Sequence, residues 1–368
     1  MKARILLLLL AIATPLSLMA AEPIVIGYAG PQSGDLAPYG IPPKDTILQA
    51  AEDLNKKGGI LGRKIKIVYQ DDVCKPEMAI NVAAKLVDQK AVAVIGHICS
   101  GATNAALSVY KSAGIPVISP SATLPELTLE GKNPNFFRTI PHDAKQAITI
   151  ANFVSNKLKA KRVAIVHDKG EYGKGLATYS QAELKNRNIK ILLFEGVTPG
   201  AVDYSALIRK LKRAKPDVIV FGGYHPEASK IVSQARKKRL KAHFIAGDGV
   251  KDPSFLKIGG KFIEGFYASS PSDISNTRIT QKLTQQLKAK DQVYGNFGLQ
   301  AHAAFMALAQ AIKQAKSTDA KKVTQALHQV ELETTLGLIS FDKNGDVQGS
   351  GFSVYQVQRG KFQAVDSQ

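Results

Sequence analysis

Two loops rich in hydroxyl groups follow short β-branched segments in the first third of the chain. One loop contains Ser100 after the segment 92–96, and the other contains Ser121 and Thr123 after the segment 115–119. The first loop opens a predicted helix, whose first amides are unpaired donors and whose dipole favours an anion. These loops therefore predict a receptor for a negatively charged group, such as a carboxylate.

Two tyrosines and one acid occupy comparable places later in the chain. Tyr172, Tyr224 and Asp248 each follow a short apolar segment. An acid flanked by tyrosines suits an ammonium group through charge-assisted hydrogen bonds and cation–π contacts. Open α/β sheets place ligands at the carboxyl ends of their strands, so we expect these groups to face the hydroxyl loops. A zwitterion with both charged groups on one carbon would bridge them.

Each of these residues also has a purely structural interpretation. Ser100 and Thr123 are suited to capping helices, and Asp248 could cap a helix beginning near Pro253 or brace a turn. Composition alone does not separate the two interpretations.

The sequence lacks the motifs for nucleotide binding, acyl transfer and metal binding. No G-x-G-x-x-G follows a predicted strand, no G-x-S-x-G occurs, and the seven histidines do not fall at zinc-ligand spacing. The segment 342–353 begins like a calcium loop, but Val347 replaces the turn glycine and Ser353 the bidentate glutamate. We therefore expect a turn there, and a protein with no catalytic residues, no metal and no cofactor.

Hydrophobic runs and helical periodicity alternate along the chain. The alternation predicts parallel sheets with right-handed crossovers. The first unit has predicted strands at 24–28, 64–69, 92–96 and 115–119, and helices at 47–56, 76–87 and 104–113. The second has predicted strands at 162–167, 191–194, 218–221 and 243–246, and helices at 177–186, 204–213 and 226–237.

The remaining segments connect these two units or return to them. Residues 133–143 contain two prolines and no helical periodicity, which favours a segment that crosses between the units. Helices at 299–315 and 321–327 and strands at 337–341 and 352–358 are too few for a third domain. We expect them to pack on the first two units and so to form two discontinuous lobes.

The N-terminus has the layout of a secretory signal. Lys2 and Arg4 precede an apolar run, and Ala20 and Ala21 provide small residues for cleavage. The run is short for a membrane span and contains Pro15. We expect cleavage near Ala20 or Ala21 and export to the periplasm.

Export to an oxidising compartment determines whether the two cysteines are free thiols or form a disulfide. Thiols pair in an oxidising compartment, so we predict a disulfide between Cys74 and Cys99, with two buried free thiols as the alternative.

The composition indicates a folded basic body. The net charge is +19, yet hydrophobic residues make up 45% of the chain and charged residues 21%, which excludes a disordered polycation. The basic run 236–241 is typical of a solvated helix end, and no aromatic residues cluster beside it. We therefore expect no nucleic-acid partner, and we expect a monomer.

Several blocks of sequence, in order, closely resemble the periplasmic leucine/isoleucine/valine-binding proteins of bacterial ABC importers. The blocks are 55–60 (NKKGGI), 69–74, 95–100 (IGHICS), 119–128, 167–175, 203–208 (DYSALI) and 222–227 (GGYHPE). The resemblance runs from about residue 24 to residue 358 and implies a type I periplasmic binding fold, with two Rossmann-like lobes joined by three crossing segments. The implied boundaries are 1–21 for the signal peptide, 22–141 plus 272–351 for lobe 1, and 142–271 plus 352–368 for lobe 2.

The resemblance also implies roles for individual residues. Ser100, Ser121 and Thr123 match positions that hold the ligand carboxylate and share its amino group, while Tyr39, Tyr172 and Tyr224 match an aromatic wall. Cys74 and Cys99 match that group's disulfide. The expected ligand-binding set is completed by Ile98, Ala122, Asp248 and His302.

Three positions depart from the family pattern. Asp248 stands where a glutamate is usual, Ser121 where alanine or glycine is usual, and His302 where a tyrosine lines the side-chain pocket. These departures leave amino-acid binding intact but put leucine selectivity in doubt.

The expected function is that of a receptor which binds one amino acid, with a branched side chain, and delivers it to a membrane permease. The alternatives are a sensory binding protein and a binder of a different amino acid or amide on the same fold.

Overall fold

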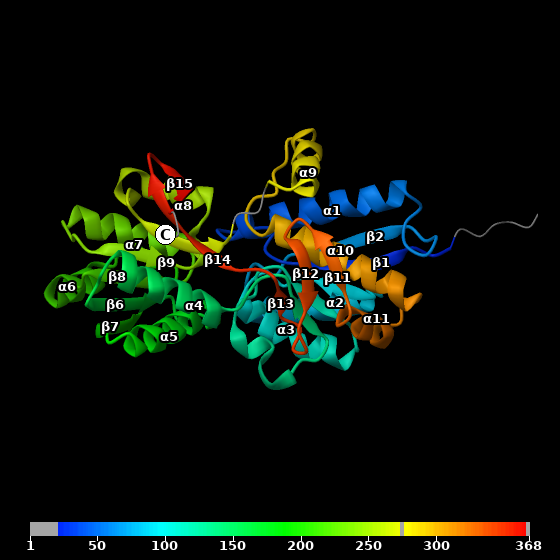
Figure 1. Ribbon diagram of the computed structural model, residues 1–368, viewed down its shortest axis with the longest axis horizontal. Helices are drawn as coiled ribbons and strands as arrows, with labels where there is room; N and C mark the ends of the chain where they lie inside the picture. The colour runs from blue at the N-terminus through cyan, green and yellow to red at the C-terminus, as the bar shows by residue number, and fades with distance from the viewer. Residues whose placement is uncertain (1–20, 273–275, 366–368) are drawn as a thin grey trace, which may run out of the picture.

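The computed structural model describes residues 21–272 and 276–365, and these residues form two lobes (Figure 1). The predicted signal peptide lies outside the described residues, apart from Ala21. Among the described residues, no helix combines the length and the apolar character needed to cross a membrane.

The first lobe is built on a five-stranded parallel sheet in the order β2-β1-β3-β4-β5. Its strands are β1 (Ile24–Ala29), β2 (Ile65–Gln70), β3 (Ala93–Ile95), β4 (Val117–Ser119) and β5 (Phe136–Arg138). Its connecting helices are α1 (Ile41–Lys56), α2 (Pro76–Asp88) and α3 (Ser100–Ser112). Because β2 lies on one side of β1 and β3 on the other, right-handed crossovers place α1 on one face and α2 and α3 on the opposite face.

The second lobe is built on a seven-stranded sheet in the order β15-β14-β10-β9-β8-β6-β7. Its strands are β6 (Arg162–His167), β7 (Lys190–Gly196), β8 (Val218–Gly222), β9 (His243–Ala246), β10 (Tyr267–Pro271), β14 (Phe352–Gln358) and β15 (Lys361–Ala364). Its helices are α4 (Asp143–Asn152), α5 (Glu171–Asn186), α6 (Ser205–Ala214), α7 (His225–Lys237) and α8 (Pro253–Gly259). Strand β14 runs antiparallel to both of its neighbours, β10 and β15, and the other pairs in this sheet are parallel. The basic run predicted at a helix end begins in the last turn of α7.

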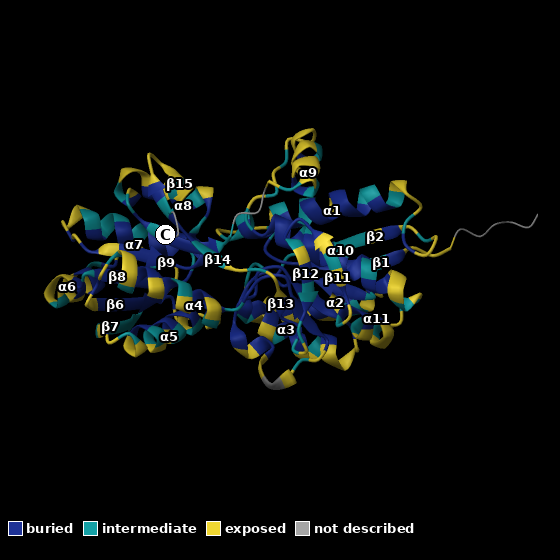
Figure 2. Ribbon diagram, in the orientation of Figure 1, coloured by how far each residue is buried: buried dark blue, intermediate teal, exposed yellow. Residues whose placement is uncertain are grey.

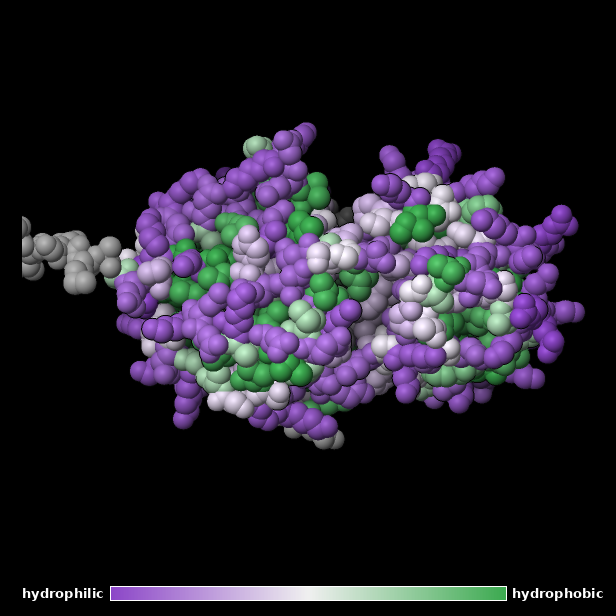
Figure 3. All heavy atoms as spheres, turned by 180° about the vertical axis from the view of Figure 1, so that it is seen from behind, coloured by the Kyte–Doolittle hydropathy of each residue, from purple (hydrophilic) through white to green (hydrophobic). Residues whose placement is uncertain are grey.

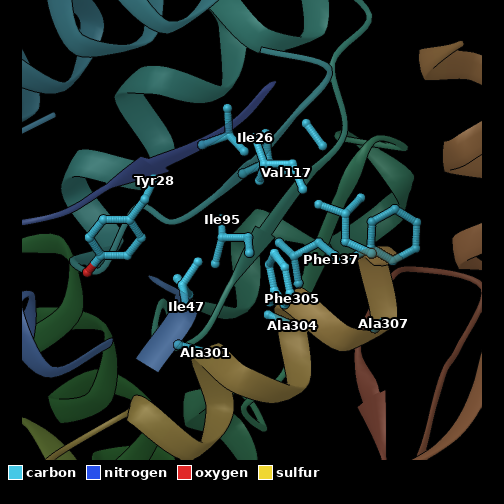
Figure 4. Packing of buried hydrophobic residues seen from close by; sticks show 14 of the residues in the cluster. Ile26, Tyr28, Ile47, Ile95, Val117, Phe137, Ala301, Ala304, Phe305 and Ala307 are labelled. Atoms are coloured by element: carbon cyan, nitrogen blue, oxygen red, sulfur yellow. The ribbon is translucent and has the colours of Figure 1, made fainter. Parts of the chain in front are cut away.

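The segment between β10 and β14 returns to the first lobe. It contains α9 (Arg278–Lys288), α10 (Gly298–Ala315), α11 (Ala320–Leu327) and the small antiparallel sheet of β11 (Glu331–Thr334), β12 (Gly337–Phe341) and β13 (Val347–Gln348). Helix α10 packs against α1, and its buried side chains join the core of the first sheet (Figure 4). Phe305 and Ala301 of this helix share one cluster with Ile26 and Ile95 of the sheet.

Both faces of the second sheet are covered. Along β6, Ala164 and Val166 belong to one buried cluster, while Val163 and Ile165 belong to another on the opposite face. Buried strands run through the middle of each lobe, whereas exposed residues lie on the outer faces of the helices (Figure 2). Double coverage explains why these strands are continuous apolar runs rather than alternating ones.

The chain passes between the lobes three times, after β5, after β10 and after β13. Two of these crossings are joined, since the Ser272 amide donates to the Gly351 carbonyl at 3.0 Å. The crossing expected at 133–143 is shorter than predicted, because Phe136–Arg138 forms strand β5 at the edge of the first sheet. The two prolines flank this strand. Its three residues are too few to show the alternation of apolar and polar residues that identifies a strand in a sequence.

The calcium-like segment is a turn between strands, as predicted. The Asp342 carboxylate accepts hydrogen bonds from the amides of Asn344 and Asp346. The Asp346 carboxylate in turn pairs with the buried Arg138 guanidinium at 2.5 Å. Among the described residues, no group of three or more potential metal ligands is found.

The predicted disulfide between Cys74 and Cys99 is present. The Cα atoms of the two residues are 5.5 Å apart, and Cys99 immediately precedes the first residue of α3. The bridge therefore ties the loop after β2 to the beginning of that helix.

Seen from behind, the molecular surface is mostly hydrophilic over both lobes, and a groove separates them (Figure 3).

Candidate functional site

The two sheets change the direction of their crossovers at points that face the same cleft. In the first lobe the change occurs between β1 and β3, and in the second between β6 and β8. Loops beyond the carboxyl ends of strands form a crevice at such points. Side chains from both crevices line a single cavity between the lobes.

The walls of this inter-lobe cavity come mostly from the residues that the sequence singles out. They are Tyr39, Ile98, Ser100, Ser121, Tyr172, Tyr224, Asp248, Gly249 and Phe297. The cavity has a volume of about 10 Å³, which is room for roughly one water molecule. An amino acid can therefore enter only when the walls move apart.

One wall carries hydroxyl groups beside a helix terminus. Ser100 is the first residue of α3, and its hydroxyl oxygen accepts a hydrogen bond from the Leu124 amide at 3.3 Å. The Ser121 hydroxyl donates to the Ile98 carbonyl at 2.7 Å. The Ser100 hydroxyl proton and the first amides of α3 are thus suited to hold a carboxylate.

The opposite wall carries the acid. Asp248 lies in the turn after β9, where the Tyr172 hydroxyl donates to its carboxylate at 2.7 Å and accepts from the Gly249 amide at 3.0 Å. Burial raises the pKa of Asp248, while the hydrogen bond from Tyr172 opposes that rise. A cation entering here would stabilise the charged form of the carboxylate. Asp248 does not cap α8, because Asp252 does.

Aromatic rings fill the space between the two walls. Tyr224 lies 5.2 Å from Tyr172 and 6.0 Å from Tyr39, measured between ring centroids. The Tyr39 hydroxyl reaches across to the second lobe, where it donates to the Gly249 carbonyl and contacts His225 Nδ1, both at 2.7 Å. Burial raises the pKa of all three tyrosines well above the ordinary value, so each phenol is neutral.

The sequence reasoning missed a second buried acid beside Asp248. Asp143 is the first residue of α4, and neither of its carboxylate oxygens has a hydrogen-bond partner among the described residues. Burial, followed by the negative charge of Asp248, raises the pKa of Asp143 well above its ordinary value. The buried side chain of Gln146 also interacts with Asp248. An acid in a first helical turn is commonplace, so the sequence carried no signal for this role.

Phe297 and Gly249 were missed as well. Phe297 precedes α10 with a φ of 61°. Its ring centroid lies 6.0 Å from that of Tyr39. Because α10 is far from the other loops in the sequence, only the return of the chain to the first lobe brings Phe297 into the cavity.

Three predicted residues do not line the cavity. Thr123 lies behind it, where its carbonyl accepts from the Asp143 amide at 2.8 Å and its buried hydroxyl has no partner among the described residues. Both backbone groups of Ala122 are engaged, with Ser119 and with Arg138. His302 lines a different cavity, which lies between α1, α9 and α10. Phe297, which lines the inter-lobe cavity, immediately precedes α10, and His302 lies more than one helical turn further along that helix.

The chain matches known proteins along nearly its whole length. The family model described as "Periplasmic binding protein" matches residues 23–361. The leucine-, isoleucine-, valine-, threonine- and alanine-binding protein of Pseudomonas aeruginosa is 38% identical over 339 residues, which are 92% of this chain and 91% of that protein. This chain belongs to the periplasmic leucine/isoleucine/valine-binding protein family.

Further members of the family agree in sequence and in structure. The Leu/Ile/Val-binding protein of Escherichia coli K12 is 38% identical over 91% of both chains. A Streptococcus pneumoniae substrate-binding protein in complex with isoleucine superposes with a TM-score of 0.83 at 30% identity, covering 93% of this chain and 99% of that one. A leucine-binding protein from Thermotoga maritima has a TM-score of 0.87 at 25% identity, with 93% and 98% covered. The expected type I periplasmic binding fold is confirmed.

Proposed function

We propose that this protein is a periplasmic receptor that binds one L-α-amino acid, with a branched aliphatic side chain, between its two lobes. The observation that supports the proposal most is the arrangement of one cavity. Ser100 and the beginning of α3 line one wall, and Asp248 lines the other. These groups have the charge preferences that an α-carboxylate and an α-ammonium require.

The proposed contacts follow from this arrangement. The carboxylate is held by Ser100 and the first amides of α3, and the ammonium by Asp248 with the help of Asp143. Ser121 lines the carboxylate wall, but its hydroxyl proton goes to the Ile98 carbonyl. The apolar side chain packs against Ile98 and the aromatic rings. Thr123 supports the acid side of the site from behind. His302 has no part in this binding, because it lines a different cavity.

The relatives support this choice of ligand. The names of the Pseudomonas and E. coli proteins specify leucine, isoleucine and valine, and the Streptococcus protein is in complex with isoleucine. Binding proteins of this kind release their ligand unchanged, so we propose no catalytic role.

Binding shifts the population towards a closed form, because contacts from both lobes exist together only when the lobes meet. We propose that the closed form, as a monomer in the periplasm, docks on a membrane ABC permease and delivers the amino acid. Closure brings the outer surfaces of the two lobes into one fixed arrangement. The permease can recognise this arrangement and so distinguish loaded from empty receptor.

The ligand proposal is tested by calorimetry on protein that has been unfolded, dialysed and refolded to remove bound solutes. Leucine, isoleucine and valine should each bind with one site per chain. Two analogues of leucine test the contribution of each wall to binding. 4-Methylpentanoate lacks the ammonium, and isoamylamine lacks the carboxylate. Both should bind far more weakly than leucine. Equal binding of either analogue, or no binding of any amino acid, would contradict the proposal.

The permease proposal has its own test. In proteoliposomes containing the ABC importer encoded by the same bacterium, leucine-loaded protein should stimulate ATP hydrolysis more than ligand-free protein does. Equal stimulation by the two forms would contradict delivery to that importer.

A further inference from the structure

A second cavity lies wholly within the first lobe, between α1, α9 and α10. Its volume is about 570 Å³. Small-molecule sites span about 300–1,000 Å³. This pocket, which is partly open to solvent, therefore has the dimensions of a ligand site.

Helix α9 roofs the cavity and is anchored near its C-terminal end. Gln286 donates to both carboxylate oxygens of Asp53 on α1, at 2.9 Å each. Just beyond the helix, Lys290 Nζ pairs with Glu52 Oε2 at 2.6 Å. The other half of the helix contributes Ile279 and Leu283 to the cavity walls. These contacts hold the roof in place, so the cavity is formed before anything enters it.

The floor of the cavity is apolar. Ala50 and Leu54 of α1 are buried there and form it together with Met306 of α10, while Leu283 adds a buried apolar side chain from the roof. Such a floor suits a hydrocarbon or aromatic body, since burial of apolar surface stabilises by roughly 25 cal/mol per Å².

The rim of the cavity favours an anion. Lys57 and Arg278 are exposed at its edge, and no carboxylate among the described residues lies within ion-pair distance of either. Asp53 is already satisfied by Gln49, Gln286 and Lys282, and the remaining acid, Glu333, is exposed. Among the described residues, these two cations without ion-pair partners face one such acid, so the rim is net positive. A guanidinium favours bidentate pairing with a carboxylate.

One wall also carries a hydrogen-bonding group. His302 lines the cavity, and its Nδ1 atom is buried with no hydrogen-bond partner among the described residues. Burial lowers the pKa of His302 to about 4, so the imidazole is neutral at physiological pH. It can hydrogen-bond to a polar ligand atom without adding charge.

We propose that this cavity binds a small apolar carboxylate, with its hydrocarbon body on Leu54, Leu283 and Met306 and its carboxylate between Lys57 and Arg278. The site is separate from the inter-lobe cavity and shares no lining residue with it. It does not depend on which amino acid the inter-lobe cavity binds.

Three eight-carbon probes test the proposal on the full mature chain. Octanoate, octanol and octylamine share one body and differ in charge, and calorimetry or saturation-transfer NMR measures their binding. Octanoate should bind saturably at one site and at least fivefold more tightly than octanol, with octylamine weakest. Absence of saturable octanoate binding, or equal binding of octylamine, overturns the proposal.

Variants locate the binding. Lys57→Gln with Arg278→Gln should weaken octanoate binding about tenfold and leave octanol binding unchanged, and Glu333→Gln should strengthen octanoate binding. The matched control, Lys85→Gln with Arg209→Gln, removes two exposed cations elsewhere and should change neither. All of these are surface substitutions, so folding is preserved. Wild-type octanoate affinity in the Lys57/Arg278 variant overturns the proposal.

A competition experiment separates this site from the inter-lobe cavity. Saturating leucine should leave the stoichiometry of octanoate binding unchanged. Displacement of octanoate by leucine would place the probe in the inter-lobe cavity and so overturn the proposal, while leaving the proposed amino-acid binding intact.

Discussion

Asp248 is the residue on which the ligand proposal depends most. It is almost fully buried and hydrogen-bonded to Tyr172, and no cationic side chain of the described residues is ion-paired with it. A buried carboxylate with only neutral partners is poised to pair with a ligand cation.

We predict that Asp248→Asn weakens leucine binding by about 2–5 kcal/mol, because the ammonium loses a buried charge partner. Calorimetry on the two proteins measures the change directly. Asp291→Asn is the control, since Asp291 is exposed, has a φ of 56° that asparagine tolerates, and lies outside the cavity. Unchanged affinity in Asp248→Asn would reject the role of this residue.

A second acid, Asp168, predicts a pH dependence of stability. It follows β6 and accepts a hydrogen bond from the Gly170 amide, and burial raises its pKa from 3.8 to about 6. Because the folded state binds this proton more tightly than the unfolded state, the contribution of Asp168 to stability is greatest below pH 4. It falls as the pH rises towards 6 and is constant above that.

The variant Asp168→Asn keeps the acceptor for Gly170 but cannot ionise. Relative to wild type, its free energy of unfolding should rise by about 2 kcal/mol between pH 4 and pH 7, at 1.36 kcal/mol per pKa unit. Urea unfolding at both pH values gives this difference. A difference that stays constant across the range would show that Asp168 ionises normally.

Four residues predicted from the loops that follow strands lie together in the structure, although their role in binding stays a prediction. Ser100, Tyr172, Tyr224 and Asp248 all line the inter-lobe cavity, because the carboxyl ends of parallel strands meet at one edge. His302 was expected at a ligand pocket from a weak local match, and its position along α10 turns it towards α9 instead. The place of Asp143 in the candidate site could be inferred only from its burial in the structure.

At the scale of elements, apolar runs bounded by turn residues were predictable even when short, whereas some edge strands and helices were not. Strands β6, β9, β12 and β14 have the predicted ends, since each is an apolar or β-branched run bounded by turn residues. Strand β5 has only three residues. Helix α9 carries Ile279, Leu283 and Leu287 at helical spacing, a signal that the prediction passed over, and α4 has few large apolar side chains. Tertiary contacts define β5 and α4, and a single sequence does not show such contacts.

The disulfide is an element-level constraint, because it joins the loop after β2 to the start of α3. Cys74→Ala with Cys99→Ala should lower the free energy of unfolding by about 3 kcal/mol, since the bridge closes a loop of 25 residues in the unfolded chain. Urea denaturation under non-reducing conditions compares the variant with wild type. Treatment with a reductant should bring wild type to the stability of the variant and leave the variant unchanged. Equal stability of wild type and variant before reduction would contradict the prediction.

At the scale of the whole molecule, the size of the inter-lobe cavity implies motion. Room for about one water cannot admit leucine, and the Tyr39 contacts with Gly249 and His225 join the two walls. Opening therefore requires the lobes to separate, and the crossing segments after β5, β10 and β13 are the places where the chain can bend.

We predict that small-angle scattering will show a larger radius of gyration for ligand-free protein than for protein saturated with leucine. The variant Asp248→Asn, at a leucine concentration that saturates only wild type, should keep the larger radius. Identical radii for wild type with and without leucine, in samples where calorimetry shows binding, would mean that side-chain rearrangement alone admits the ligand.

The placement of α10 also determines the order in which the lobes can be completed. The central sheet of the second lobe, from β6 to β10, is continuous in sequence, so most of its core is available as soon as residue 271 has been synthesised. The first lobe begins earlier but lacks the buried face of α10 until residues 298–315 follow. Until then α1 alone covers the face of the sheet that α10 completes, while the strands β6 to β10 emerge. The contacts of α10 with α1 and β3 join segments separated by most of the chain, so their formation is slow and the waiting intermediate is prone to aggregation. The strands β6 to β10 are therefore the part that can form first, whereas the first lobe is completed only by α10, and the second-lobe sheet gains its edge strands β14 and β15 last.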